Sequence, residues 1–170
     1  HWEDFGPDNG RRILEKYRDQ ICTFNDDMQG TGAIALASVI SAVQRADLSM
    51  KDQRVVVFGS GTAGVGIADQ IRDAMIADGL DEQTATSQIW CIDVQGLLTD
   101  DMADQLRDYQ RPYARPASEA ADFPATGPGG KISLADVVAT IHPTILVGTS
   151  TAPHTFTEPI IRDMASHCAR

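Results

Sequence analysis

Basic residues are scarce in this sequence. Of its 170 residues, 14 are Lys or Arg and 24 are Asp or Glu, so the formal net charge is −10 and the pI is near 4.6. Neutralising nucleic-acid phosphates requires clustered cations, whereas the few basic residues here are scattered along the chain. We therefore expect no nucleic-acid partner.

Cysteines are few, and long apolar runs are absent. Cys22, Cys91 and Cys168 are far apart and odd in number, which argues against a disulfide framework or a Cys-x-x-Cys metal motif and favours a reducing compartment. No apolar stretch approaches the roughly 20 residues that span a bilayer, and residues 1–4 do not resemble a secretory leader. We expect a soluble, cytoplasmic protein that does not contact membranes. The missing initial Met and the end directly after a helical pattern suggest a fragment of a longer protein.

The hydrophobic pattern predicts strands alternating with helices. Short apolar or β-branched runs at 54–58, 89–92 and 144–147 predict buried parallel strands. Helices are expected at 62–78, at 134–141 and from 157 onward, because each has a capping residue at one end. This alternation predicts an α/β fold with a doubly wound parallel sheet. Residues 95–130, rich in Pro and Gly, are expected to form loops.

Two helical segments precede the first expected strand. Residues 8–21 carry an apolar stripe among charges and predict an amphipathic helix. Residues 31–43 are small and apolar with almost no charge, which predicts a buried helix. A polar turn at 24–27 separates the two, so we expect a helical lead-in before the sheet.

A glycine motif lies where the first strand gives way to a helix. Gly59, Gly61 and Gly64 have the Gly-x-Gly-x-x-Gly spacing, with Thr62 and Ala63 between them. In a dinucleotide site the first glycine allows a tight turn, the second admits the pyrophosphate and the third lets helix and strand pack closely. The backbone N–H groups and the helix dipole then hold the phosphates. A plain strand-to-helix turn is the alternative.

Two further segments end predicted strands at the same edge of the sheet. Asp93 can accept a hydrogen bond from a ribose hydroxyl and repel a 2′-phosphate, which favours NAD over NADP. It lies farther from Gly64 than the roughly 20 residues usual for this motif, and residues 79–86 account for the extra length. Gly148, Thr149 and Ser150 follow the last strand, where ligands bind in open α/β sheets. A loop or capping role for Asp93, and a simple turn at 148–150, stay open.

Two acidic pairs form a second constellation. Glu3-Asp4 and Asp26-Asp27 each lie next to an aromatic residue and outside a regular element. Hard divalent cations prefer such oxygen ligands, and paired carboxylates also serve proton chemistry. Carboxylates in front of helices are usually caps, and spacing alone favours that reading. The four histidines show no His-x-x-x-His spacing, so structural or solvated roles are expected for them.

Several segments together resemble the malic enzymes. The strings that carry the resemblance are Trp2-Glu-Asp-Phe-Gly6, Ile21-Cys-Thr-Phe-Asn-Asp-Asp-Met-Gln-Gly-Thr31, the Gly59 turn with Val65-Gly-Ile-Ala68, Ile92-Asp-Val-Gln-Gly-Leu-Leu98 and Phe156-Thr-Glu158. The resemblance runs the length of the chain, and the Phe-Asn-Asp-Asp string is its most specific part.

The resemblance implies roles for the acidic pairs. Glu3, Asp4 and Asp27 match the carboxylates that ligate Mn or Mg, and Asp26 matches an aspartate that supports the catalytic lysine and tyrosine. It also implies that Thr31 lies at the NAD site, that L-malate is the substrate and that the parent protein is a homo-oligomer. Residues 1–30 would end a preceding catalytic region, and 31–170 would be a Rossmann-type NAD-binding domain truncated at its C-terminus.

Within the family, four features are most similar to malolactic enzymes, which convert L-malate to L-lactate and CO2 with NAD and manganese. They are residues 1–9, Gly32 after Gln-Gly-Thr, His142-Pro-Thr144 and Gly148-Thr-Ser-Thr-Ala-Pro153. The alternative is an NAD-dependent malic enzyme, which releases pyruvate, CO2 and NADH.

Some features depart from the family pattern. Its tyrosine and general-base lysine would precede His1, and its asparagines would follow Arg170, so the fragment alone is expected to be inactive. Trp2 replaces a usual Phe and Met28 a common Ile. Another dehydrogenase-like Rossmann domain, or a nucleotide-binding module without catalysis, would share the glycine motif. The dehydrogenase-like domain would not explain the acidic pairs, whereas the module without catalysis stays open for this fragment.

Overall fold

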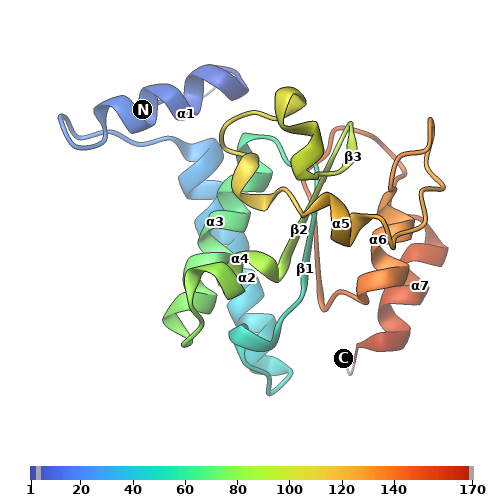
Figure 1. Cartoon of the computed structure of the whole chain (residues 1–170). Coiled ribbons are helices and arrows are strands. Elements are labelled where there is room, and N and C mark those ends of the chain that lie inside the picture. Colours follow the sequence, from blue (N-terminus) through green and yellow to red (C-terminus); the bar gives the residue numbers. More distant parts are fainter. Residues whose placement is uncertain (3–4, 169–170) are drawn as a thin grey trace.

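A four-stranded sheet forms the centre of the molecule. The computed structural model describes residues 1–2 and 5–168 (Figure 1). The strands follow the order β3-β2-β1-β4, and their bounds are β1 (Val55–Phe58), β2 (Ile89–Asp93), β3 (Gly96–Leu97) and β4 (Ile145–Gly148). Strand β1 pairs in parallel with both β2 and β4, whereas β3 runs antiparallel to β2.

Helices cover both faces of the sheet. Figure 1 shows α2, α3 and α4 on one side and α6 and α7 on the other. The helices are α1 (Pro7–Tyr17), α2 (Thr31–Arg45), α3 (Thr62–Ala77), α4 (Glu82–Ser87), α5 (Ala117–Ala120), α6 (Leu134–Ile141) and α7 (Glu158–His167). The chain passes from β1 to β2 through α3 and reaches β4 through α6, on the opposite face. The predicted doubly wound α/β fold is confirmed.

Strand β1 explains why the sheet needs two helical layers. Val55 and Val57 pack into the cluster shared with α3, while Val56 packs with residues of α6. All three valines are fully buried. Because side chains alternate between the faces of a strand, a strand that is apolar on both faces is stable only with cover on each. Burial of each valine contributes about 1.5–3 kcal/mol.

The segment 95–130 is more ordered than the expected loops. It contains β3, α5 and two short 3-10 helices, Asp100–Gln105 and Arg111–Tyr113. Gly96 has φ +95°, a left-handed conformation that L side chains rarely adopt, and it lets the chain reverse after β2. The sheet is therefore parallel except at this edge, which the hydrophobic pattern did not indicate.

Helix α2 forms where it was expected, but its predicted burial is wrong. Only Gly32 and Val43 are buried within it, and Ile34 is 73% exposed. The helix packs on α3 along one side: a Cβ at Gly32 would lie 3.2 Å from the carbonyl oxygen of Gly66. The uncharged composition of α2 indicates that its burial would be favourable. It does not tell which other surface would cover the helix.

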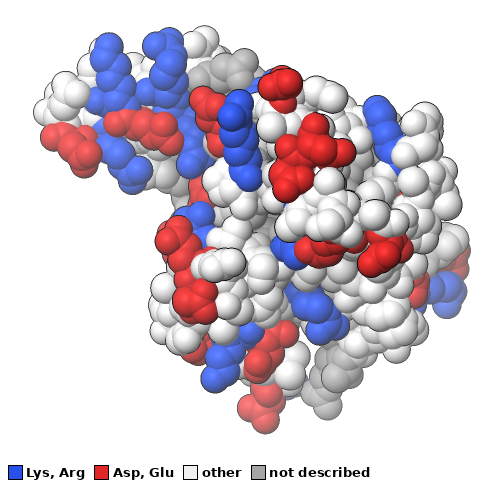
Figure 2. Space-filling model, viewed as in Figure 1, with Lys and Arg blue, Asp and Glu red and all other residues white. Residues whose placement is uncertain are grey.

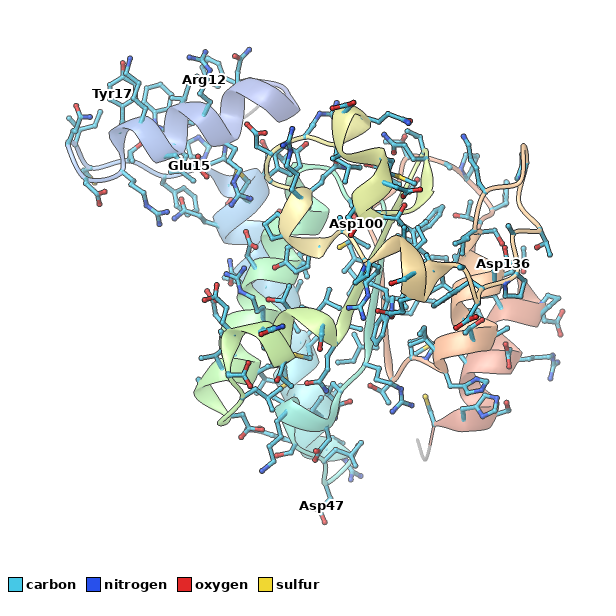
Figure 3. The ribbon with its side chains drawn as sticks, in the orientation of Figure 1. Arg12, Glu15, Tyr17, Asp47, Asp100 and Asp136 are labelled. Atoms are coloured by element: carbon cyan, nitrogen blue, oxygen red, sulfur yellow. The ribbon has the colours of Figure 1, made fainter. Side chains whose placement is uncertain are left out.

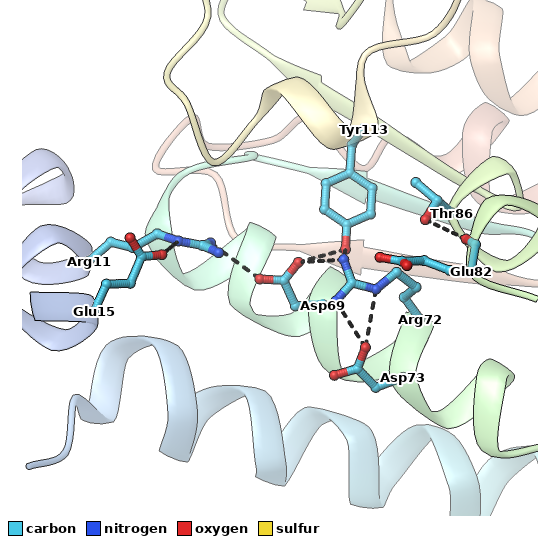
Figure 4. A network of polar contacts seen from close by, with 8 residues as sticks. All are labelled: Arg11, Glu15, Asp69, Arg72, Asp73, Glu82, Thr86 and Tyr113. Atoms are coloured by element: carbon cyan, nitrogen blue, oxygen red, sulfur yellow. Dashed lines mark hydrogen bonds and ion pairs between the residues drawn. The ribbon is translucent and has the colours of Figure 1, made fainter. Parts of the chain in front are cut away.

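A polar network fixes the lead-in helix α1 to α3 (Figure 4). Arg11 of α1 contacts Asp69 of α3 at 3.2 Å, and the hydroxyl of Tyr113 donates to the same carboxylate at 2.7 Å. Arg72 adds an ion pair to Asp69 at 3.4 Å. Burial, together with the charge of Asp69, raises the pKa of Tyr113, so its hydroxyl stays protonated as a donor. The expected helical lead-in is present, although α1 ends at Tyr17 rather than at residue 21.

The surface charges are mixed on the face that Figure 2 shows. Acidic and basic side chains alternate over α1 and around it, and the basic ones form no separate patch on this face. Within the described residues, no helix is both long and apolar enough to cross a membrane.

Candidate nucleotide site and acidic lead-in

The parallel pairing brings three predicted segments to one edge of the sheet. Phe58 at the end of β1 is aligned with Ile92 of β2 and with Gly148 of β4. The residues that follow these positions therefore lie side by side at the carboxyl ends of the strands. The connection from β1 to β2 crosses one face of the sheet, whereas α6, which leads into β4, covers the other. Open α/β sheets bind ligands at such a point.

The first and third glycines of the motif allow close backbone approach. Gly59 has φ +98°, and a Cβ there would lie 2.6 Å from Cα of Ser150. A Cβ at Gly64 would collide with the carbonyl oxygen of Gly59 and lie 2.7 Å from Oγ1 of Thr149. The backbone N–H of Gly59 donates to the carbonyl of Ile92 at 2.8 Å. These contacts hold the turn against both neighbouring strands.

The second glycine faces open space. A Cβ added at Gly61 would meet no atom within 4 Å, and the residue has an ordinary φ of −73°. Gly61 precedes α3, whose first residues are Thr62 and Ala63, so the N–H groups at the start of this helix are available to an anion. The open space at Gly61 fits the close approach of a pyrophosphate.

The segment 148–150 is part of the same edge. The N–H of Thr149 donates to Phe58 at 2.9 Å, and its hydroxyl donates to the carbonyl of Gly59. A Cβ at Gly148 would lie 2.7 Å from the ring of Phe156, so this glycine admits an aromatic side chain. The structure brings Gly148, Thr149 and Ser150 to the glycine turn, as the sequence predicted.

Asp93 is joined to the glycine turn by a residue that sequence reasoning missed. The amide nitrogen of Gln110 donates to Oδ2 of Asp93 and to the carbonyl of Ser60, both at 2.8 Å. Gln110 is 1% exposed. The N–H of Val94 donates to the other carboxylate oxygen at 2.9 Å. Gln110 lies in the segment expected to be loop, where no pattern singled it out.

A cavity of about 360 Å³ adjoins Asp93. Its walls come from the strand ends Phe58 and Ile92, from residues 127–128 and 131–135, and from Ile160. Its volume and mainly apolar lining are within the range of small-molecule sites.

Asp136 holds the loop that forms one wall of this cavity. Figure 3 labels this residue on α6, beside that loop. Its carboxylate accepts hydrogen bonds from Thr126 and from the N–H and hydroxyl of Ser133, in a capping box. Burial alone would raise the pKa of Asp136, but these hydrogen bonds outweigh it and hold the pKa below its usual value.

The acidic pair Asp26-Asp27 opens a π-helical turn, Asp26–Gly30, rather than an irregular loop. The side chain of Asn25 caps this turn by accepting from the N–H of Met28 at 3.0 Å. A Cβ at Gly30 would collide with the carboxylate of Asp26, so this carboxylate lies directly over the glycine. The turn continues into α2 at Thr31, whose N–H donates to the carbonyl of Asp26.

The turn packs against the helix that follows the glycine motif. A Cβ at Gly66 of α3 would lie 2.8 Å from the carbonyl oxygen of Met28, and the amide of Gln70 donates to the carbonyl of Gln29 at 3.1 Å. The acidic turn and the start of α3 are therefore neighbours, although they are far apart in the sequence.

Trp2 links the N-terminal segment to the residues just before the acidic turn. Its N–H donates to the carbonyl of Phe24 at 2.7 Å, its indole donates to Thr23, and its carbonyl accepts from the side chain of Asn25. Glu3 and Asp4, which the sequence pairs with Asp27 as metal ligands, lie outside the described residues.

These features define a class of protein: a Rossmann-type domain with an acidic segment packed beside the helix that follows its glycine motif. Comparison with known proteins specifies the family. The sequence model of the malic enzyme NAD-binding domain matches residues 28–170. The chain belongs to the malic enzyme family.

Curated relatives of both catalytic types are similar to this chain. It is 55% identical over 170 residues to NAD-dependent malic enzyme 3 of Bacillus subtilis, covering 100% of this chain and 30% of the relative. It is 46% identical to the malolactic enzyme of Lactiplantibacillus plantarum, again over 100% of this chain and 30% of the relative. The chain thus spans about 30% of the length of these relatives. The identity is higher to the malic enzyme, so overall identity does not favour the expected malolactic type.

Solved structures support the fold. A crystal structure of an NAD-dependent malic enzyme from Thermotoga maritima has a TM-score of 0.71 at 20% identity and covers 95% of this chain and 38% of that one. The crystal structure of the malic enzyme of Entamoeba histolytica has a TM-score of 0.68 at 20% identity and covers 99% of this chain and 31% of that one.

Proposed function

We propose that the protein carrying this chain decarboxylates L-malate with NAD and a divalent cation, and that this chain holds the NAD. The observation that carries the proposal is the glycine turn: Gly61 faces open space at the edge of the sheet where Asp93 and Ser150 also lie. Family membership supports malate as the substrate, because both relatives named above are malate enzymes. NAD would accept a hydride from malate, and the cation would stabilise the negative charge that decarboxylation produces.

The residues of the turn would position the dinucleotide. Backbone N–H groups at Gly61, Thr62 and Ala63 would donate to the pyrophosphate, and Thr149 and Ser150 would border the nicotinamide side of the edge. Asp93 would accept from the adenosine ribose and repel a 2′-phosphate, which favours NAD over NADP. Gln110 would orient Asp93, since it binds one carboxylate oxygen and the turn at once.

The acidic lead-in would supply the cation ligands. Asp27, with Glu3 and Asp4, offers the oxygen donors that Mn²⁺ or Mg²⁺ prefers. Support comes from Trp2, whose contacts with Phe24 and Asn25 join the start of the chain to the residues just before Asp26-Asp27. Asp26 would support the catalytic lysine and tyrosine of the rest of the protein. Residues 1–30 would then close the catalytic region, and 31–170 would form the NAD-binding domain.

The products distinguish two versions of this function. The higher identity to an NAD-dependent malic enzyme favours release of pyruvate and NADH. Residues 142–144 and 148–153, which resemble malolactic enzymes, favour a second candidate in which the hydride returns to pyruvate and lactate is released. Because 148–150 lies at the cofactor edge, it is placed to influence how long NADH stays bound.

The deciding experiment uses the whole protein with malate, Mn²⁺ and NAD. We expect pyruvate and NADH in equal amounts; lactate with almost no net NADH would assign the malolactic reaction instead. Absence of turnover with NAD or NADP, and with Mn²⁺ or Mg²⁺, would contradict the proposal as a whole. The isolated chain should bind NAD and turn over no malate.

The assembly and location of the protein belong to the same proposal. We propose a cytoplasmic homo-oligomer, and the exposed apolar surface of α2 around Ile34 supports contact with further protein surface. Light scattering on the whole protein tests the oligomer, and a monomer at micromolar concentration would contradict it.

A further inference from the structure

Two histidines and an aspartate meet at the edge of the sheet opposite the glycine turn. His142, Asp163 and His167 each offer a ligand atom, and all of these atoms lie within 4.8 Å of one another. His142 precedes β4, whereas Asp163 and His167 lie one turn apart on α7. Sequence spacing missed the group because only the fold brings His142 to the Asp-x-x-x-His pair.

The backbone fixes the position of His142. This residue ends α6 in a left-handed conformation, with φ 50° and ψ 63°. The guanidinium of Arg54 donates to its carbonyl oxygen at 2.6 and 3.1 Å, and also to that of Ile141 at 3.0 Å. Because its backbone is fixed in this way, His142 directs its ring toward α7, where it contacts His167.

One nitrogen of His142 lacks a partner. Its Nδ1 is buried and has no hydrogen bond in the described structure. A buried polar atom without a partner costs about 1–3 kcal/mol, and a bound ion or water is one explanation for such an atom. The ring of His142 stacks on that of His167, with centroids 3.6 Å apart, and Nε2 of His167 lies 3.4 Å from Oδ1 of Asp163.

We infer that His142, Asp163 and His167 bind a divalent transition-metal ion of the zinc type. Two imidazoles and one carboxylate form a donor set that suits Zn²⁺, Co²⁺ or Ni²⁺ better than Mn²⁺ or Mg²⁺. Ligand atoms around zinc lie about 2.0–2.2 Å from the ion, so the two stacked rings have to rotate apart for all three donors to face one centre.

A soft donor adjoins the cluster in the sequence but is not one of its three members. Cys168 follows His167 directly, and its thiol lies 3.6 Å from the carbonyl oxygen of Pro143, the residue after His142. An ion bound here would join the last turn of α7 to the end of α6. The site is separate from the proposed malate cation site in its position and in its ligand chemistry, and it does not depend on the proposed function.

Calorimetric titration of the metal-free chain with ZnCl2 tests the inference, without malate or NAD. We expect the original chain to bind one Zn²⁺. The Asp27→Ala variant, which changes the proposed malate cation site, should bind the same amount. His167→Ala and His142→Asn should each weaken this binding at least tenfold. Asn is chosen at 142 because it tolerates the left-handed conformation.

His154→Asn is the matched control. His154 also has a positive φ, 59°, but lies outside the cluster, so this variant should bind zinc normally. Circular dichroism confirms that each variant is folded, and the absorption of bound Co²⁺ gives a second readout, which should disappear with His167→Ala. Zinc affinity that is unchanged in both cluster variants, or absent from the original chain, would overturn the inference.

Discussion

The glycine turn and the acidic lead-in are parts of one proposed site, but different kinds of contact build them. The turn is shaped by backbone contacts, such as those of Gly59 with Ser150 and Ile92. The lead-in depends on side chains, such as Asn25 with Trp2 and Arg11 with Asp69. Close backbone contacts can be recognised in the local sequence, because only glycine fits at such positions. Side-chain contacts between distant segments cannot be recognised in this way, and the family pattern was needed to select the acidic residues.

The largest expected effect is on the turn, through Gly61→Val. The branched side chain would occupy the space of the pyrophosphate, so NAD affinity should fall about a hundredfold, or roughly 3 kcal/mol. Because a Cβ at this position meets no atom within 4 Å, the variant should keep its melting temperature. Titration with NAD and thermal unfolding measure the two quantities.

Gly64→Ala is the control for this change. Its Cβ would collide with the carbonyl of Gly59, so this variant should lose stability as well as affinity. If Gly61→Val bound NAD normally, the turn would not be the phosphate site.

The lead-in is tested by Asp69→Ala. The change would release Arg11 and leave the hydroxyl of Tyr113, a residue 1% exposed, without its acceptor. An unsatisfied buried hydroxyl costs about 1–3 kcal/mol, so we expect a loss of about 2 kcal/mol in the free energy of unfolding in urea.

Asp73→Ala is the matched control on the same helix. Asp73 pairs with Arg72 but its side chain is 64% exposed, and surface ion pairs contribute about 0–1 kcal/mol. Equal losses in the two variants would show that the network does not hold α1 in place.

The strands and the glycine turn could be predicted because their causes are local. The β-branched run in β1 is buried on both faces, and such an apolar strand is stable only in a sheet that helices cover on both sides. Gly79 ends α3 with φ +109°, and Ser133 caps α6 with its side chain. In each case one residue type satisfies a requirement of its own short segment.

The role of Gln110, the exposure of α2 and the meeting of the two histidines could not be predicted, because each depends on residues far away in the sequence. Nothing in the neighbourhood of Gln110 indicates that its amide will join Ser60 to Asp93. The apolar composition of α2 gave the helix but not its exposure, since exposure depends on what other surfaces cover it. His142 and His167 meet only because the end of α6 packs against α7.

A smaller effect separates the two cofactors. Asp93→Asn removes the charge that would repel a 2′-phosphate, so the ratio of NAD to NADP affinity should fall about tenfold, or roughly 1.4 kcal/mol. Gln110→Leu should weaken NAD binding without changing this ratio, because the charge of Asp93 remains. Asp108→Asn, at a side chain 98% exposed, controls for the change in net charge. An unchanged ratio in Asp93→Asn would show that Asp93 does not face the ribose.

The smallest expected effect concerns the cavity wall and depends on pH. Hydrogen bonds from Thr126 and Ser133 hold the pKa of Asp136 below its usual value. Its contribution to stability is therefore complete above the ordinary Asp pKa of about 3.9 and is lost as the pH falls through the lower folded-state value. Asp136→Asn should lower the free energy of unfolding by about 1 kcal/mol at pH 7. The difference in this free energy between the variant and the original chain should narrow below about pH 4.

Thr126→Val removes one hydrogen-bond donor to Asp136 and should give a weaker form of the same pH dependence. Urea unfolding at a series of pH values measures both variants, and a difference that stayed constant into acid would mean that the charge of Asp136 does not hold the loop.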